Sequence, residues 1–409
     1  MKILFITSGF LPAVMSENLC NGKLILAFLR ENWNVDVITR DSEISYSKGW
    51  EEPWLELKKI TYEIKYPIGN RLERLLDTIK SSIMMCGYPI AGIRWARRAY
   101  QKALDLHKKN HYDVIITRSP SDIAHIVGYK FSKKTGVKWI ANWNDPATNI
   151  WPFPRNYSWI KWYIHERYNH LILKNADITT FPAESLRDHF KSHYSYIDEN
   201  KTAIVPHIAL VSGFIKEYST SSGENVFRLC YSGNICKDRD IEFLLEAICE
   251  MQKEHCKIRF DILGTSDEYT NNMISKYNID CIHFLGSFPY LKALNIMSTY
   301  DVFILIEQRM DYGIYFPSKL VDYAQLNKPI LAISPIKGFV STSLTTLGGG
   351  IVADNTSREE VKNALSKLYK AWEEGNLSLF SPQKILSRSS CTRVVNIYKY
   401  IFKCIGCLN

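Results

Sequence analysis

The feature of this sequence that most constrains its fold is an alternation of strand-like and helix-like patterns, which occurs twice along the chain. In the first half, short apolar runs alternate with amphipathic stretches at residues 23–31, 94–108 and 123–134. The apolar runs are residues 2–6, 35–39, 60–64, 113–117, 138–142, 178–182 and 203–205. Such an alternation predicts a parallel sheet with helices on both faces.

A second series begins after the polar segment 219–225 (STSSGEN), which is typical of a hinge. Strand-like runs occupy 227–231, 257–263, 281–285, 301–306, 329–333 and 349–353, and helix-like stretches occupy 241–252, 291–298, 318–326 and 358–373. We therefore expect an α/β protein of two doubly wound, Rossmann-like domains facing across a cleft. The expected domains are residues 1–215 and 226–380, with 381–409 packing back on the first. Ligands of such sheets bind at the carboxyl ends of the strands.

The composition fits two globular domains without a membrane span. The chain has 409 residues, and no apolar run approaches the roughly 18–20 residues of a transmembrane helix. The opening residues MKILFIT are too short for a signal-peptide core. Among ten cysteines, only Cys404 and Cys407 have a paired spacing, so we expect reduced thiols and a cytoplasmic protein.

The net charge of +9 lies almost entirely in the first half. Residues 1–210 contain 29 Lys and Arg against 21 Asp and Glu, a balance of +8. Within residues 71–109, nine basic residues stand against three acids, among apolar and aromatic side chains. We expect this stretch to hold the protein at the anionic inner face of the cell membrane, with a solvated helix face as the alternative. No zinc-finger, RNP-like or basic-zipper pattern accompanies it, so nucleic acid is not an expected partner.

The loop after the first strand of the second series is a candidate anion site. It reads Tyr-Ser-Gly-Asn-Ile-Cys-Lys-Asp-Arg over 231–239, so Gly233 lets the backbone approach an anion and Asn234 follows it. Lys237 and Arg239 stand where a diphosphate would lie beside the next helix. Two solvated loop cations are the alternative interpretation, because neither GxxxxGK[ST] nor GxGxxG occurs.

A second candidate follows the strand that ends at Glu307. After a loop over 308–317, Ser318 is placed to cap a helix whose free N–H groups would hold phosphate oxygens, and Lys319 adds a cation. Asp322, one turn further, would accept the two hydroxyls of a ribose; its alternative role is an acid that favours the helix dipole. Glu307 contacts the ligand or anchors the loop, and the residues leave both open.

These residues give the second half a resemblance to the donor domain of GT-B-fold glycosyltransferases, particularly the retaining family four. The resemblance rests on the acid, short helix and proline of 322–331 (DYAQLNKPIL) and on Pro-Ser-Lys before them, as in bacterial surface-polysaccharide transferases. It implies a diphosphate loop at Gly233, Lys237 and Arg239, and a base-side loop at Gly286 and Phe288. The family's first glutamate would fall on Ile314, and the glycine pair of its first loop is absent.

In the first half, the segment 141–146 (ANWNDP) resembles an acceptor-side segment of related transferases. Asp145 would orient an acceptor hydroxyl or support charge on the anomeric carbon, with a turn cap before proline as the alternative. Arg118 would meet a phosphate of a lipid-linked acceptor, or is an ordinary surface arginine. Asn142 completes this expected acceptor set.

The resemblance implies a hexosyltransferase-type enzyme that moves a sugar from a nucleotide-diphosphate sugar to a membrane-associated, lipid-linked saccharide in surface polysaccharide biosynthesis, with retention. Cations and backbone N–H groups would neutralise the leaving phosphate, so no metal or other cofactor is expected. Two alternatives stay open: a sugar-nucleotide 2-epimerase of the same architecture, and a catalytically silent binding scaffold.

Overall fold

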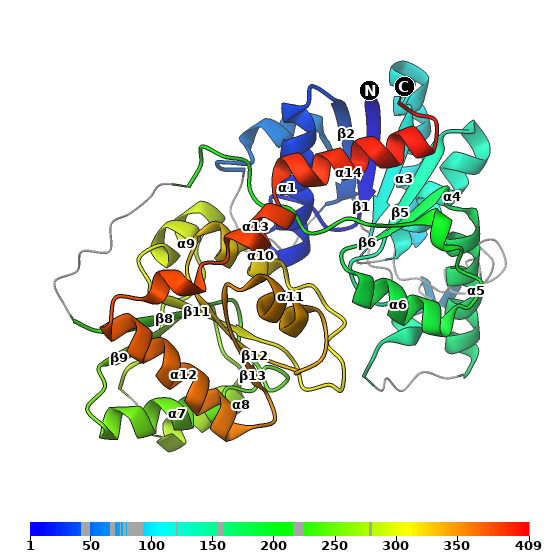
Figure 1. Ribbon diagram of the computed structural model, residues 1–409. Helices are drawn as coiled ribbons and strands as arrows, with labels where there is room; N and C mark the ends of the chain where they lie inside the picture. Colours follow the sequence, from blue (N-terminus) through cyan, green and yellow to red (C-terminus); the bar gives the residue numbers. More distant parts are fainter. Residues whose placement is uncertain are drawn as a thin grey trace. The chain divides into compact units, whose positions relative to one another are not determined.

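The computed structural model describes residues 1–41, 50–65, 70–73, 75–76, 79, 93–119, 122–153, 159–215, 225–277 and 280–408 (Figure 1). The chain divides into two compact units: unit 1 is Met1–Pro206 with Cys391–Asn409, and unit 2 is His207–Ser390. The expected limits were residues 215, 226 and 381. The segment after Pro206 belongs to unit 2 because Leu210 exchanges two hydrogen bonds with the side chain of Gln325. Residues 219–224 of the expected hinge lie outside the described residues.

Unit 1 is built on a seven-stranded parallel sheet with the order β3-β2-β1-β4-β5-β6-β7. Its strands are β1 (Lys2–Thr7), β2 (Asn34–Arg40), β3 (Thr61–Ile64), β4 (Val114–Arg118), β5 (Lys138–Asn142), β6 (Ile178–Phe181) and β7 (Thr202–Ile204). Its helices are α1 (Ser16–Arg30), α3 (Ile93–Asn110), α4 (Ile123–Thr135), α5 (Trp159–Asn175), α6 (Glu184–His193) and α14 (Cys391–Cys404), with 3-10 turns at Leu55–Ile60, Thr148–Ile150 and Glu199–Lys201.

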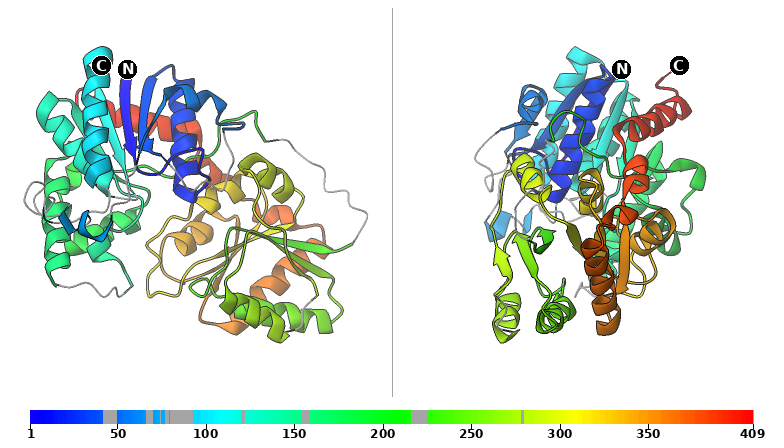
Figure 2. Two further views of the ribbon diagram at one scale, coloured as in Figure 1. Left: turned by 180° about the vertical axis from the view of Figure 1, so that it is seen from behind. Right: turned by 60° about the vertical axis from the view of Figure 1, so that its left-hand side comes forward.

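The last helix of the chain, α14, packs on α1, the first helix (Figures 1 and 2). Tyr398 and Phe402 bring their rings within 4.9 and 5.3 Å of Phe28 and Trp33, and all four side chains are buried. Aromatic contacts of this kind add to the burial of apolar area. They explain why the end of the chain belongs to unit 1.

Unit 2 is built on a six-stranded parallel sheet with the order β10-β9-β8-β11-β12-β13. Its strands are β8 (Phe227–Ser232), β9 (Ile258–Leu263), β10 (Ile282–Phe284), β11 (Val302–Ile306), β12 (Ile330–Ser334) and β13 (Gly350–Asp354). Its helices are α7 (Glu242–Lys253), α8 (Glu268–Tyr277), α9 (Tyr290–Met297), α10 (Ser318–Gln325), α11 (Phe339–Leu347), α12 (Arg358–Glu373) and α13 (Gln383–Arg388), with a 3-10 turn at Leu377–Phe380.

Both sheets have helices on their two faces, so their central strands are buried throughout. Every residue of β4, β11 and β12 is buried, as parallel sheets require. Each strand-like run of the sequence overlaps one observed strand, and the predicted class of two Rossmann-like domains, the GT-B fold, is confirmed. The helix α5 was not expected, because its residues (WIKWYIHERYNHLILKN) show no one-sided apolar pattern.

The strand order fixes where each unit can hold a ligand. It reverses direction between β1 and β4 in unit 1, and between β8 and β11 in unit 2. At such a switch point the loops after neighbouring strands diverge to opposite faces, which leaves a crevice at the carboxyl edge of the sheet. The loops after β8 and β11 border this crevice in unit 2, and those after β1, β4 and β5 border it in unit 1.

Candidate functional site

Gly233 forms the turn directly after β8, and glycine is required there. Its φ is +122°, and its N–H donates to the carbonyl of Leu263, 2.8 Å away. A Cβ at this position would lie 2.5 Å from the Lys319 ammonium, and a Cβ on Gly264 would lie 2.1 Å from the Gly233 carbonyl oxygen. The backbone at Gly233, the backbone at Gly264 and the Lys319 side chain are thus packed so closely that neither glycine can be replaced by a residue with a side chain without displacing its neighbours.

Lys319, at the start of α10, is held against the end of β8. Its ammonium donates to the Tyr231 hydroxyl at 3.0 Å and lies 4.1 Å from the centroid of the Tyr231 ring. Burial lowers the pKa of Lys319 below its usual range, the hydroxyl of Tyr231 opposes this shift, and the charge of Arg239 adds to it. The cation is therefore poorly solvated, which is the state in which a phosphate contact stabilises it most.

The remaining residues of the Gly233 loop are arranged around this lysine. The Asn234 side-chain oxygen accepts from the N–H and the hydroxyl of Thr265, both at 3.0 Å, which fixes the loop. Arg239 is exposed and reaches back to the Asn234 carbonyl at 3.4 Å. Lys237 is exposed too, but its ammonium lies 5.7 Å from the centroid of the Tyr269 ring. The structure thus brings Arg239 and Lys319 together, while Lys237 lies beside another helix.

Ser318 is the first residue of α10 and does not cap it. Pro317 occupies the cap position and provides no side-chain hydrogen bond. The expected cap was wrong because the helix begins one residue earlier than expected, which makes Ser318 a helical residue and leaves Pro317, whose side chain has no hydrogen-bonding group, at the cap position. The backbone N–H groups of the first turn of α10 lie at the N-terminus of this helix, where Lys319 also lies.

Asp322 is linked to the loop that contains Gly286 and Phe288. The hydroxyl of Tyr290 donates to its carboxylate at 2.6 Å. Tyr290 begins α9, directly after that loop, where Gly286 has a φ of +77° and the ring of Phe288 lies 5.2 Å from the Lys292 ammonium. One carboxylate thus connects the two segments that the sequence assigned to the nucleoside.

Glu307, directly after β11, is buried beneath the loop that it begins. Its carboxylate accepts from the Ser334 hydroxyl at 2.6 Å, and its carbonyl accepts from the Asn355 side chain at 3.2 Å. Burial raises the pKa of Glu307 to about 7, and the Ser334 hydrogen bond opposes the shift. A Cβ on Gly313 would lie 3.6 Å from a Glu307 carboxylate oxygen, so the loop closes directly over this carboxyl.

One Asp-x-Asp tripeptide, Asp238–Arg239–Asp240, lies in the Gly233 loop. The expectation of a metal-free site did not take it into account. Asp240 forms an ion pair with Arg309 at 3.1 Å and accepts from the Glu242 N–H, whereas Asp238 is exposed. Within the described ranges, no group of three or more His, Cys, Asp and Glu residues is arranged to hold a metal ion.

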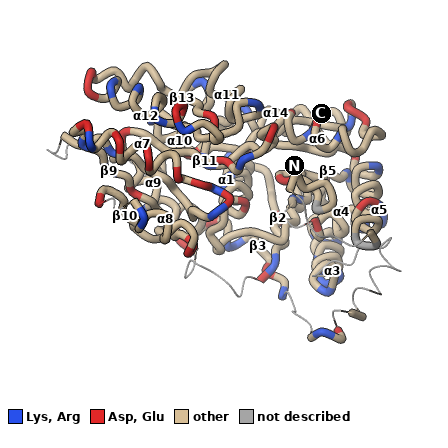
Figure 3. The backbone as a smooth tube through the Cα atoms, turned by 90° about the horizontal axis from the view of Figure 1, so that it is seen from below, with Lys and Arg blue, Asp and Glu red and all other residues tan. Residues whose placement is uncertain are grey.

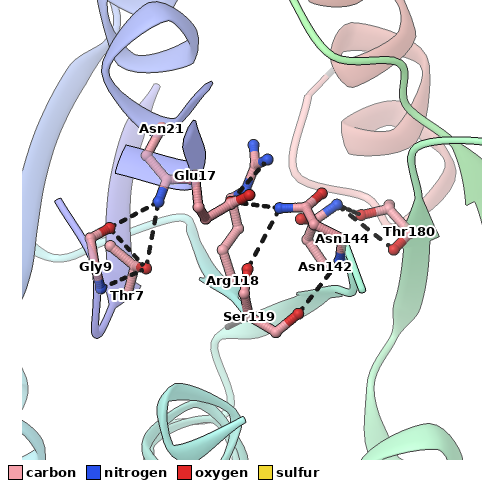
Figure 4. Close-up of polar contacts among 9 residues, drawn as sticks. All are labelled: Thr7, Gly9, Glu17, Asn21, Arg118, Ser119, Asn142, Asn144 and Thr180. Carbon is pink, nitrogen blue, oxygen red and sulfur yellow. Dashed lines mark hydrogen bonds and ion pairs between the residues drawn. The ribbon is translucent and has the colours of Figure 1, made fainter. Parts of the chain in front are cut away.

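In unit 1, the carboxyl ends of β4 and β5 carry a buried polar cluster (Figure 4). Arg118 forms an ion pair with Glu17 of α1, with Nη2 and Oε1 3.2 Å apart. The Asn144 side chain donates to the same Glu17 oxygen and to the Ser119 carbonyl. Asp145 follows directly and is partly exposed.

Asn142 extends this cluster toward β6. Its amide nitrogen donates to the Thr180 hydroxyl at 2.8 Å, and the side chain is buried. Sequence reasoning brought Arg118, Asn142 and Asp145 together on one sheet edge but missed Glu17 and Asn144. The one signal for Glu17 was its place in the first turn of the helix after β1, where an acid is often found for helix-dipole reasons alone.

The basic stretch 71–109 is only partly described, since Arg74, residues 77–78 and residues 80–92 lie outside the described residues. On α3, Arg97, Arg98, Lys108 and Lys109 are exposed, and Figure 3 shows the basic positions along the helix. Arg94 lies 3.4 Å from Glu73. No helix among the described residues is both long and apolar enough to cross a membrane.

Comparisons with known proteins agree with this arrangement. Residues 226–371, which span the sheet of unit 2, match the family described as glycosyl transferases group 1. No curated protein sequence matches the chain. Among solved structures, the Anabaena protein HepE in complex with UDP-glucose is 15% identical, with a TM-score of 0.68 and 100% of each chain covered.

Two further solved structures share the fold over nearly the whole length. Sucrose-phosphate synthase from Thermosynechococcus elongatus is 12% identical, with a TM-score of 0.66, covering 99% of this chain and 96% of that one. A putative UDP-N-acetylglucosamine 2-epimerase from Listeria monocytogenes is 11% identical, with a TM-score of 0.62, covering 100% and 97%. At these identities the likeness shows the architecture.

Proposed function

We propose that the chain, whose residues 226–371 match the group 1 glycosyltransferases, is such an enzyme and transfers a hexose-type sugar from a nucleotide sugar to a lipid-linked saccharide at a membrane surface. The observation that carries the proposal is the meeting of Gly233, Lys319 and Arg239 at the carboxyl end of β8. A glycine turn, two cations and the start of a helix are together what a diphosphate requires.

The donor would be held by unit 2. Lys319, Arg239 and the first N–H groups of α10 would bind the diphosphate, with Lys237 as a third cation. Asp322 would accept the ribose hydroxyls, its free rotation limited by the hydrogen bond from Tyr290. The loop at Gly286 and Phe288 would lie on the side of the base, and HepE, which shares the fold, was solved with UDP-glucose.

The reaction breaks the bond between the anomeric carbon and the β-phosphate, so negative charge develops on the departing diphosphate. Cations that are already fixed and desolvated stabilise that charge without reorganisation. Lys319 meets this condition because Tyr231 and the Gly233 turn enclose its ammonium. We propose that these groups replace a divalent metal and that the anomeric configuration is retained.

The acceptor would be held by unit 1, at the edge where Arg118, Asn142 and Asp145 lie. Asp145 would orient the acceptor hydroxyl or support the positive charge that develops on the anomeric carbon. The exposed arginines of α3 would bring this unit to an anionic leaflet, where each basic residue contributes about 1 kcal/mol.

A mass-spectrometric screen tests this proposal. The full chain is incubated with a panel of nucleotide sugars, each with and without lipid-linked saccharides, and the released nucleoside diphosphate and the new glycoside are measured together. Transfer that depends on the acceptor supports the proposal. Interconversion of a nucleotide sugar without an acceptor would identify an epimerase, and the absence of any turnover together with retained nucleotide binding would favour the scaffold.

A further inference from the structure

We propose that Glu17 is a specificity-determining residue: it neutralises Arg118 and so makes the carboxyl edge of unit 1 accept an uncharged, hydroxyl-bearing part of the acceptor and exclude phosphate. This inference rests on the proposed function, because it names the chemical class of the acceptor group. It also changes the role that the sequence suggested for Arg118, which was to meet a phosphate.

The first observation is a buried ion pair. The side chain of Arg118 is 6% exposed and that of Glu17 is 16% exposed, with 3.2 Å between Nη2 and Oε1. Asn144 donates to the same carboxylate oxygen, so Glu17 joins α1 to the ends of β4 and β5 (Figure 4). A guanidinium as buried as this needs a compensating charge, and the protein itself supplies it.

The charge balance decides which ligands can enter. An unpaired, poorly solvated guanidinium binds phosphate strongly, because its fork of N–H donors matches the phosphate oxygens. A phosphate bound to Arg118 would lie within a few ångströms of the Glu17 carboxylate, which has the same sign of charge and repels it. A saccharide hydroxyl brings no charge and meets no such repulsion.

The unused hydrogen-bonding capacity of the cluster indicates the same class of ligand. Among the described residues, Asn21 Oδ1, Asn142 Oδ1 and Arg118 Nε are buried without a hydrogen-bond partner. The orientation of both amides is fixed, because Asn21 Nδ2 donates to the Gly9 carbonyl and Asn142 Nδ2 donates to Thr180.

Two acceptors and one donor are therefore left at one edge of the sheet. A hydroxyl group can donate to one of the two amide oxygens and accept from Arg118 Nε. An ionised phosphate can only accept. The phosphate of a lipid-linked acceptor would accordingly lie away from Arg118, with its saccharide part at the cluster.

Inorganic sulfate is the probe that tests this inference, read at a single residue. The full chain is labelled with nitrogen-15 in arginine, and the Arg Nε–H signals are followed by NMR during sulfate addition at constant ionic strength. The Arg118 signal is identified by its loss in Arg118→Gln. We expect it to stay unmoved in the wild type, while the Arg239 signal shifts and serves as an internal positive control.

In Glu17→Gln, the charge of Arg118 is no longer balanced, so its signal should shift and saturate with sulfate, with an affinity at least about tenfold above that of the wild type. The double variant Glu17→Gln/Arg118→Gln removes both charges, and the Arg239 titration should be the same in it as in the wild type. If Glu17→Gln does not fold, Glu17→Asp, one methylene shorter, should give a partial response.

A wild-type Arg118 signal that follows sulfate would overturn the inference, as would an unmoved signal in folded Glu17→Gln. Neither result depends on donor or turnover. A failed transfer screen would instead overturn the proposed function, so the two failures can be distinguished.

Discussion

The ammonium of Lys319 lies 3.0 Å from the hydroxyl of Tyr231 and 4.1 Å from the centroid of its ring. Tyr231 is the residue before the last of β8, and Lys319 is the second residue of α10, 88 positions away. The contact places a cation over the turn at Gly233, where the strand order of unit 2 reverses. The donor site proposed above depends on this contact, and the predictions below follow from it and from its surroundings.

Gly233→Ala should weaken nucleotide binding more than it destabilises the fold. The methyl group would lie 2.5 Å from the Lys319 ammonium and would displace it, and a φ of +122° is strained for any side chain, at about 1–3 kcal/mol. Gly375→Ala is the matched control, because its φ is +71° and no atom lies within 4 Å of the new Cβ. Calorimetric titration with nucleoside diphosphates should show reduced affinity for Gly233→Ala alone. Equal affinities in the two variants would count against the site.

Ionisation of the buried Glu307 carboxyl should lower the stability of unit 2 as the pH rises. Its pKa is about 7 in the folded protein against an ordinary 4.5, so between these values the folded state binds a proton that the unfolded chain has released. The free energy of unfolding should therefore fall across this window, by about 3 kcal/mol in total.

Urea unfolding at about pH 5 and about pH 8 checks this prediction. Glu307→Gln should lose this part of the pH dependence and be more stable than the wild type at the higher pH. The exposed Glu359→Gln should keep the wild-type dependence. A wild-type slope in Glu307→Gln would show that another group is responsible.

Transfer activity should survive excess chelator. The cations around Gly233 and the start of α10 would carry the charge of the leaving diphosphate, so no divalent ion is required. The measurement is the rate of nucleoside diphosphate release before and after EDTA treatment. The outcome that would refute this account is a loss of activity that magnesium or manganese restores, and Asp238 and Asp240 would then be the first ligands to examine.

Replacing Arg94, Arg97 and Arg98 of α3 by glutamine should release the protein from anionic liposomes. Each basic residue near the leaflet contributes about 1 kcal/mol, screened by salt. The control variant replaces three lysines elsewhere in unit 1, Lys133, Lys134 and Lys174, by glutamine. It should keep much of the wild-type binding to anionic liposomes. Liposome flotation at low salt measures the bound fraction of each protein. A wild-type protein that ignores anionic liposomes would point to a soluble acceptor.

The sequence predicted the strands of both sheets because their residues are buried on two faces and form continuous apolar runs. It also singled out Gly233 and Lys319, which the fold brings together, since a turn glycine and a cation at a helix start can be identified from local spacing; their binding role stays a prediction. Local spacing and burial are the properties that a single sequence records best.

The contacts that complete each site were not predictable in the same way. Glu17 and Asn144 are 127 positions apart, and the order of the strands decides that they meet. Arg118 was expected to meet a phosphate or to be an ordinary surface arginine because its ion-pair partner, Glu17, is remote from it in the sequence. The helix α10 starts one residue earlier than expected, a shift that hydrophobic periodicity does not resolve.

Calorimetric titration of the full chain with a panel of nucleoside diphosphates, repeated with Lys319→Ala and Arg239→Ala, tests the central claim most directly. We expect at least one nucleoside diphosphate to bind the wild type. Each variant should bind it ten- to a hundredfold more weakly, which corresponds to about 1.5–3 kcal/mol for a charged hydrogen bond lost. Lys367→Ala, an exposed lysine of α12, should bind as the wild type does. A wild type that binds no nucleoside diphosphate, or wild-type affinity in both variants, would contradict the account.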